Sequence, residues 1–209
     1  MYKRQANAGV VKKNVFVPSV FRHVQRQGET PVFVDWFARQ GWTVAPLPTN
    51  ASFEGAGDAL YCGETLFAGY VNRSEISSHA QIGKLFECQV LSLELVDPRY
   101  YHLDTCFCPL APGVALYYPG AFDEYGRRVL EGNVGTLIPV VEEEAVRFGC
   151  NAVVIGRDVV HNIGCPNMAA NLERLEFRSH PTDLDEFLKS GGSAKCLTLR
   201  LDGEEAAPW

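Results

Sequence analysis

The sequence is poor in the features that mark membrane-spanning and exported proteins. Its 209 residues contain no apolar run long enough to cross a bilayer, and the N-terminus has no hydrophobic signal segment. The seven cysteines form no CxxC pair and no paired framework, as expected for reduced thiols in the cytoplasm. Positive charge is also scarce, since the net charge is −6, so we expect neither a nucleic-acid partner nor an anionic membrane surface.

A complete set of metal ligands is missing as well. Cys106 and Cys108 lie two residues apart on a predicted strand, which places both thiols on one face. His102 could join them, but no second cluster completes the four ligands that structural zinc takes. We therefore predict that the protein holds no metal.

The chain does contain a repeated pattern. Two short strands, a helix and a third strand follow one another about every fifty residues, and about four such units are present, the first of them partial. No low-complexity linker separates the units, and one unit alone cannot bury its apolar face. We therefore predict a single α/β domain whose units pack around a shared centre.

The first polar cluster is Phe53-Glu54-Gly55-Ala56-Gly57-Asp58-Ala59, directly before a predicted strand. Two carboxylates on a tight glycine loop suit a planar cation such as guanidinium, which binds carboxylates as a bidentate fork. The alternative is a capped turn in which Asp58 bonds its own backbone. Taken alone, the cluster leaves both interpretations open.

The second cluster is Tyr100-Tyr101-His102-Leu103-Asp104-Thr105, one repeat further along the chain. On an extended chain Asp104 lies on the same side as His102, where it could orient the imidazole or bind a substrate. A lone histidine at the start of a strand is more often a surface or core residue, so His102 needs support from elsewhere in the sequence.

The third cluster occupies residues 191–198, where two glycines are followed by Lys195 and Cys196. The glycines permit a sharp turn, and the Lys195 charge favours a thiolate at Cys196. The alternation of leucines after the cysteine predicts a strand, in which Cys196 could equally be a buried, inert thiol. Glu54, His102 and Cys196 each lie at the edge of one repeat, however, and a cysteine with a distant histidine is typical of an activated thiol site.

Three motifs, FEGAGDAL, YYHLDTCFCPL and GGSAKCLTLRL, resemble those of the guanidino-group-modifying (pentein) superfamily. This superfamily contains dimethylarginine dimethylaminohydrolases, arginine deiminases, arginine dihydrolases and amidinotransferases. The resemblance extends from Ala6 to Leu201 and implies a pseudo-fivefold α/β propeller of ββαβ repeats. It also implies that the chain is incomplete at the N-terminus: residues 6–202 form a catalytic domain without its first repeat, residues 1–5 a non-native leader and residues 203–209 a tail. We expect such a fragment to have an open or distorted site and little activity.

The same resemblance assigns roles to single residues. Cys196 is expected to be the nucleophile and His102 the general acid and base. Glu54 and Asp58 are expected to hold the guanidinium group, helped by Asp104.

Two further residues are expected to contact the substrate. Arg73 matches an arginine that binds the substrate α-carboxylate, although a surface arginine before a helix is an alternative interpretation. Asn7 stands where deiminases carry an aspartate, and in this respect it resembles the asparagine of arginine dihydrolases.

The implied reaction is hydrolysis of a guanidino C–N bond of arginine or N-methylated arginine through a thiouronium intermediate on Cys196, giving citrulline or ornithine. The partner is therefore a small guanidino compound, and no cofactor is expected. Alternatives are amidine transfer to an amine, a non-catalytic propeller-type binding protein, and a thiol sensor at Cys106 and Cys108. The sequence leaves the oligomeric state open, with a homodimer as one alternative.

Overall fold

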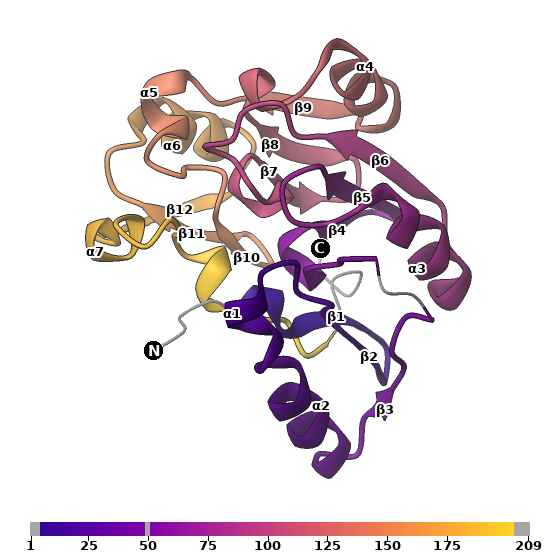
Figure 1. The fold of residues 1–209 in the computed structure, drawn as a ribbon. Helices are drawn as coiled ribbons and strands as arrows, with labels where there is room; N and C mark the ends of the chain where they lie inside the picture. The colour runs from indigo at the N-terminus through magenta and orange to yellow at the C-terminus, as the bar shows by residue number, and fades with distance from the viewer. Residues whose placement is uncertain (1–4, 49–50, 203–209) are drawn as a thin grey trace.

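The computed structural model describes residues 5–48 and 51–202, and within them the strands form four three-stranded sheets. Each sheet is built from three consecutive strands of the chain (Figure 1). In order, the sheets contain β1 (Gly9–Lys12), β2 (Val15–Pro18) and β3 (Thr43–Val44); β4 (Ala59–Cys62), β5 (Thr65–Tyr70) and β6 (Val90–Glu94); β7 (Phe107–Ala111), β8 (Val114–Tyr117) and β9 (Thr136–Pro139); and β10 (Val153–Ile155), β11 (Asp158–Asn162) and β12 (Arg178–Thr182).

All four sheets have the same topology. The first two strands form an antiparallel hairpin, and the third strand lies parallel to the second. A parallel neighbour needs a crossover, which a helix provides in every unit. These crossover helices are α2 (Thr30–Arg39), α3 (His79–Phe86), α4 (Glu124–Asn133) and α6 (Pro166–Arg174). The predicted ββαβ repeat is therefore confirmed.

Each hairpin turns at a residue with positive φ. Gly63, Gly113 and Gly156 have φ values of 63°, 74° and 57°, and the first hairpin uses Lys13 with a φ of 52°. Glycine enters this region without steric cost, whereas a side chain enters it only when the surrounding hairpin imposes the turn. The recurrence of one turn geometry at one place in the unit supports the repeat independently of the strands.

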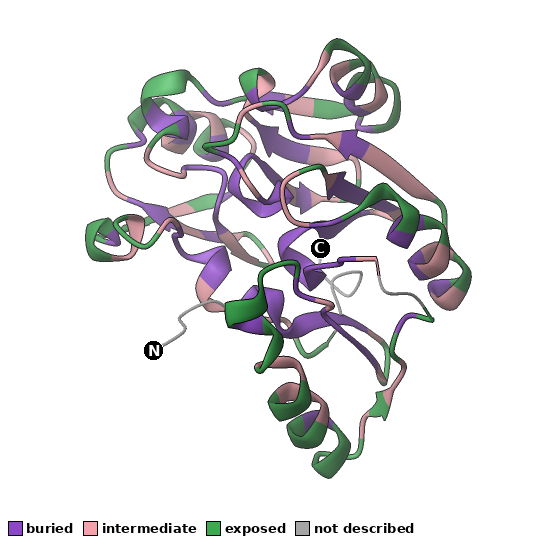
Figure 2. Ribbon diagram, viewed as in Figure 1, coloured by how far each residue is buried: buried purple, intermediate pink, exposed green. Residues whose placement is uncertain are grey.

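The sheets are arranged around a common centre, with β1, β4, β7 and β10 innermost (Figure 1). Buried positions gather at this centre, while α2 and α7 (Asp185–Leu188) are largely exposed (Figure 2). The largest buried cluster joins the second, third and fourth sheets, and the Phe67 and Phe107 rings lie 5.3 Å apart within it. Full burial of each such ring contributes about 2–3 kcal/mol to folding. Contacts between neighbouring units thus supply the core that no unit has alone.

Two local predictions were wrong. The leucine alternation after Cys196 does not form a strand: a 3₁₀ turn, η6 (Lys195–Leu197), is followed by irregular chain, because no described strand pairs with it. Asp104 is not on extended chain either, since it lies in the 3₁₀ turn η4 (Leu103–Thr105), and β7 begins only at Phe107.

The ends of the chain lie mostly outside the described residues. Of the predicted leader, residues 1–5, only Gln5 is described, and it begins η1 (Gln5–Ala8). The predicted tail, residues 203–209, is not among the described residues. No helix in the described part of the chain is long and apolar enough to cross a bilayer.

Candidate active site

Short 3₁₀ turns place the predicted site residues at one edge of the ring. Asn7 lies in η1 before β1, Asp58 follows η2 (Gly55–Gly57) before β4, Asp104 lies in η4 before β7, and Cys196 lies in η6. The turn η1 contacts both η2 and η6, and η2 also contacts η4. The four side chains are almost completely buried, each with at most 1% of its surface exposed. Corresponding positions of different repeats therefore converge in space.

The centre of the site is a buried pair between Glu54 and His102. Glu54 Oε2 lies 2.8 Å from His102 Nε2, and neither side chain has exposed surface. A carboxylate at this distance holds the ring proton on Nε2. His102 Nδ1 is buried and has no hydrogen-bond partner among the described residues. The imidazole thus presents an unused nitrogen that can accept or donate a proton.

Glu54 is held in its charged form by the groups around it. Burial alone would raise its pKa, but the hydrogen bond and charge of His102, together with Arg73 and Arg26, keep that pKa below its ordinary value. The guanidinium groups of Arg73 and Arg26 lie 3.7 and 3.8 Å from Glu54 Oε2. A permanent anion is therefore present beside the imidazole.

Asp58 behaves differently, although it lies four residues away. Its Oδ2 accepts a 2.6 Å hydrogen bond from Ser74 Oγ, and its Oδ1 accepts a 3.0 Å bond from the Leu103 backbone. Burial nevertheless raises the pKa of Asp58 to about 6. The carboxylate bonds Ser74 of its own repeat and Leu103 of the next repeat, and not its own turn, so the interpretation as a simple capped turn is wrong.

The nucleophile candidate lies in a turn that requires glycine. A Cβ atom at Gly192 would stand 3.0 Å from Cys196 Cβ and 3.2 Å from Cys196 Sγ, and Gly191 has a φ of +74°. Cys196 Sγ lies 3.5 Å from Asp104 Oδ2. The two glycines thus permit the turn that places the thiol against a carboxylate.

Arg73 borders this arrangement as a partly exposed cation. Its guanidinium group lies 4.8 Å from the centre of the Tyr101 ring, and 19% of its side chain is exposed. The Tyr101 hydroxyl in turn donates a hydrogen bond to the backbone oxygen of Gly191. Arg73 is therefore part of the site and not a plain surface residue before a helix.

Asn7 is joined to the same network through its amide. Its Nδ2 donates to the backbone oxygen of Glu54 at 3.0 Å, and its Oδ1 accepts from Arg26 Nη1 at 3.2 Å. Gly57 makes room for this amide, because a Cβ there would lie 2.2 Å from Asn7 Nδ2. All seven residues predicted for the site therefore lie in one connected region.

Three buried residues of this region were not predicted from the sequence: Arg26, Ser74 and Asn151. Arg26 bonds Glu29 through two contacts of 2.9 Å. Ser74 links the two carboxylate positions, because its hydroxyl accepts from the Glu54 backbone at 2.9 Å and donates to Asp58. Of the three, only Asn151 could have been found from the sequence. It lies 47 residues after Asp104 and 45 before Cys196, so it is separated by about one repeat length from each.

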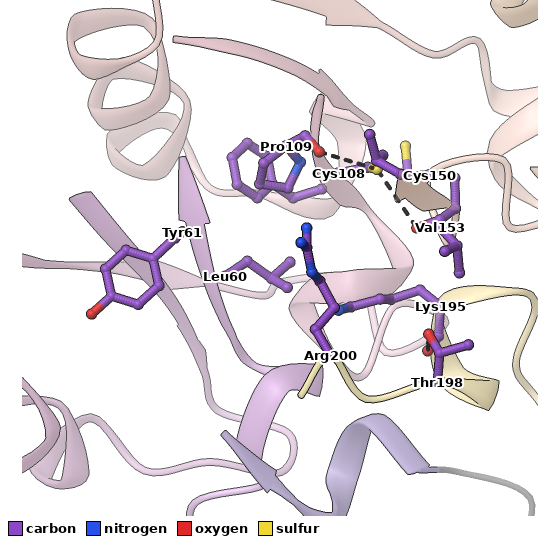
Figure 3. A pocket seen from close by; sticks show the side chains of 12 residues that line it. Leu60, Tyr61, Cys108, Pro109, Cys150, Val153, Lys195, Thr198 and Arg200 are labelled. Atoms are coloured by element: carbon purple, nitrogen blue, oxygen red, sulfur yellow. Dashed lines mark hydrogen bonds between the residues drawn. The ribbon is translucent and has the colours of Figure 1, made fainter. Parts of the chain in front are cut away.

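A separate cavity lies between the inner strands. It has a volume of about 50 Å³ and is lined mainly by β4, β7 and β10 and by the chain after Cys196, with Lys195 and Arg200 among its polar residues (Figure 3). Glu54, Asp58 and His102 do not line it. Small-molecule sites usually have several hundred Å³, so this cavity has room for water but not for a guanidino amino acid.

Residues 10–202 match the family described as "N,N dimethylarginine dimethylhydrolase, eukaryotic". The chain belongs to this family. The match confirms the resemblance to the guanidino-group-modifying superfamily, and with it the propeller-like α/β fold.

Two curated relatives extend the comparison. The bifunctional arginine dihydrolase/ornithine cyclodeaminase AgrE of Nostoc sp. is 50% identical over 200 residues, which are 94% of this chain and 28% of AgrE. The N(G),N(G)-dimethylarginine dimethylaminohydrolase of Mycobacterium tuberculosis is 38% identical over 196 residues, 94% of this chain and 64% of that enzyme. The chain thus spans less than a third of AgrE and just under two thirds of the mycobacterial family member.

Solved structures of the family include the N-terminal domain of ArgZ, an arginine dihydrolase from cyanobacteria. A cysteine-to-serine variant of that domain, bound to substrate, superimposes with a TM-score of 0.92 at 48% identity, covering 95% of this chain and 74% of that chain. An asparagine-to-serine variant of the same domain is covalently bound to a reaction intermediate; its TM-score is 0.91, with 94% of this chain and 74% of that chain covered.

Proposed function

We propose that this chain carries the active centre of a hydrolase that cleaves a guanidino C–N bond of arginine or N-methylated arginine, with Cys196 as the nucleophile. The observation that supports the proposal is the convergence of a buried thiol, a buried Glu54–His102 pair and two further carboxylates at one edge of the ring. A guanidinium cation needs carboxylates to hold it, a nucleophile for its carbon and an acid for its leaving amine.

In the proposed first half-reaction His102 Nδ1 takes the Cys196 proton, and the thiolate attacks the guanidinium carbon. His102 then returns the proton to the leaving nitrogen, so that ammonia or a methylamine departs as the C–S bond is completed. Glu54 stabilises the imidazolium that forms in between, while Asp58 and Asp104 hold the charge of the guanidinium and of the thiouronium intermediate.

In the second half-reaction His102 removes a proton from water, and the hydroxide adds to the thiouronium carbon. The C–S bond breaks as the added hydroxyl loses its proton to solvent, His102 returns its own proton to the Cys196 thiolate, and citrulline leaves. Both half-reactions use only groups of this chain and water, so no cofactor takes part in them.

Arginine is the substrate that the relatives favour. Identity to AgrE is 50% and to ArgZ 48%, against 38% to the mycobacterial dimethylarginine enzyme. Asn7 supports the same choice, because its uncharged amide stands where deiminases carry an aspartate. A dihydrolase repeats the hydrolysis on citrulline and releases ornithine, carbon dioxide and a second ammonia. We therefore propose ornithine, with two ammonia molecules for each, as the product.

The composition of the chain supports a cytoplasmic location for the proposed reaction. All seven cysteines are free thiols in the structure, which fits the reducing cytoplasm. The net charge of −6 fits a small cationic substrate better than nucleic acid or an anionic membrane. Amidine transfer, simple binding and a homodimer are not favoured by any specific contact in the described part of the chain.

The test is detection of citrulline, ornithine and ammonia with arginine and with asymmetric dimethylarginine as substrates. We expect Cys196→Ser to lower product formation by at least about a thousandfold, as for loss of other covalent nucleophiles. Cys165→Ser is the matched control, because Cys165 is also a buried free thiol but lies against the Glu144 backbone in the fourth unit. Turnover by Cys196→Ser equal to that of Cys165→Ser would contradict the proposal.

A further inference from the structure

Asn151 joins the turn that carries the nucleophile to the turn that carries Asp104. It is completely buried and lies just before β10. Its Oδ1 accepts hydrogen bonds from the backbone nitrogens of Ser193 at 2.8 Å and Cys196 at 3.2 Å. Its Nδ2 donates to the backbone oxygen of Asp104 at 2.9 Å. One side chain therefore bridges two turns that are far apart in the sequence.

The backbone of Asn151 adds to this bridge. Its carbonyl oxygen accepts a 3.1 Å hydrogen bond from the Lys195 nitrogen. Three of the four backbone N–H groups from Ser193 to Cys196 thus point to one residue. Asparagine is suited to this position because its short amide carries an acceptor and a donor on one fork, whereas aspartate lacks the donor.

The consequence concerns the contact between Cys196 and Asp104. Cys196 Sγ lies 3.5 Å from Asp104 Oδ2, and both residues are held by Asn151 through their backbones. We infer that Asn151 is a positioning residue, which fixes the thiol relative to the carboxylate that holds the guanidinium. The inference rests on the proposed function, since it concerns the same nucleophile.

The expected effect is on the chemical step more than on substrate binding. A displacement of about 1 Å in a reacting group can cost about a hundredfold in rate. Of the residues expected to hold the substrate, Asn151 bonds only Asp104, through the backbone oxygen, and it has no hydrogen bond to Glu54, Asp58 or Arg73 among the contacts of the described residues. We therefore expect Asn151→Ala to lower kcat about a hundredfold while KM for arginine changes less than about threefold.

Asn162 provides the matched control. It is also a completely buried asparagine whose amide bonds backbone groups, accepting from Leu184 at 3.0 Å and donating to Arg147 at 3.3 Å. It has no hydrogen bond to the residue 193–196 turn. Asn162→Ala should lower the melting temperature as much as Asn151→Ala but change kcat less than about threefold.

A second measurement does not depend on turnover. Alkylation of Cys196 by iodoacetamide, followed by mass spectrometry of its peptide across pH, reports the reactivity and pKa of this thiol directly. Asn151→Asp keeps the size and the acceptor but adds a buried negative charge beside the Cys196 backbone, so it should raise the midpoint of the profile. Asn151→Ala should change the alkylation rate at least fivefold.

The outcomes are distinguishable. Alkylation profiles of Asn151→Ala and Asn151→Asp that coincide with those of wild type and Asn162→Ala would overturn the inference, as would an equal loss of kcat in both alanine variants. If wild type released no product from any guanidino compound, the proposed function would fail, and the alkylation profiles would still decide the role of Asn151.

Discussion

At the scale of single residues, different surroundings shift the pKa values of two carboxylates of the site in opposite directions. The hydrogen bond and charge of His102 and two arginines outweigh burial at Glu54 and lower its pKa. At Asp58 burial outweighs the effects of His102, of the Ser74 hydroxyl and of the Leu103 N–H, and it raises the pKa to about 6. Loss of a proton from Asp58 is therefore coupled to the arrival of a cation, because only the anion can pair with guanidinium. The ionised Asp58 carboxylate is therefore unfavourable in the empty site and becomes favourable when a guanidinium group pairs with it.

The pKa of Asp58 gives a prediction for substrate binding. Below pH 6 the carboxyl group is protonated in the free protein, so arginine must displace that proton. We expect KM for arginine to rise up to about tenfold for each pH unit below 6. A KM that stays constant between pH 5 and pH 7 would show that Asp58 does not hold the guanidinium.

The same shift predicts an effect on stability. The folded state holds the Asp58 proton more tightly than the unfolded state, whose pKa is near 3.8, so this group destabilises the fold progressively as pH rises from 4 to 6. At pH 7 the penalty is about 3 kcal/mol. Asp58→Asn should therefore raise the free energy of unfolding at pH 7 while it removes arginine binding.

The control for that variant is Asp158→Asn. Hydrogen bonds from Arg178 and His180 lower the pKa of Asp158, so its charge contributes stability that is lost as pH falls. Chemical denaturation at pH 7 should show the two substitutions acting with opposite signs. If Asp58→Asn also lowered the free energy of unfolding, burial would not dominate the Asp58 environment.

At the scale of elements, a strained turn after β5 presents Arg73 to the site. Val71 has a φ of +97°, which a β-branched residue adopts only when its surroundings impose it. Its backbone oxygen accepts a 2.6 Å hydrogen bond from Arg22, and its nitrogen donates to Ser74 at 3.1 Å. The strained residue Val71 therefore lies in the segment that positions Arg73, the cation expected to bind the substrate carboxylate.

Replacement of Val71 by glycine tests whether the strained turn holds Arg73 in place for substrate binding. Val71→Gly removes the steric strain and should raise KM for arginine at least threefold, because Arg73 loses a fixed position, while kcat changes little. Glu87→Gly is the control, since Glu87 also has positive φ (50°) but ends α3, away from the site. Steady-state kinetics with equal KM for both variants would contradict a positioning role for this turn.

The elements also show what the sequence could predict. Hairpins and crossover helices depend on local turn residues and periodicity, so the ββαβ repeat could be predicted correctly, whereas the roles of the three site motifs stay predictions. The segment after Cys196 could form a strand only if a neighbouring strand paired with it, and the sequence of the segment alone does not show whether such a neighbour is present. Ser74 and Asn151 were missed because their partners lie far away in the sequence, 16 and 20 residues from Ser74 and 42 to 47 residues from Asn151. A serine or asparagine in a connecting segment looks like an ordinary turn residue.

At the scale of the whole molecule, the site depends on the ring. Each inner strand begins at the same edge, so one polar residue from each of the four repeats arrives at one place: Asn7, Asp58, Asp104 and Asn151. The turn η6, which follows the fourth sheet, adds Cys196. No single repeat contains both the nucleophile and its acid. The expectation that a repeat upstream of Ala6 completes the ring and raises turnover stays a prediction.

The most direct test of the account is identification of the covalent intermediate on this protein. The wild-type protein, mixed with arginine and quenched in acid during turnover, should carry the mass of arginine less one ammonia, and digestion should place that mass on the Cys196 peptide. The Cys196→Ser variant should carry none. An adduct on another cysteine, or product formation by the Cys196→Ser protein, would contradict the central claim that Cys196 attacks the guanidino carbon.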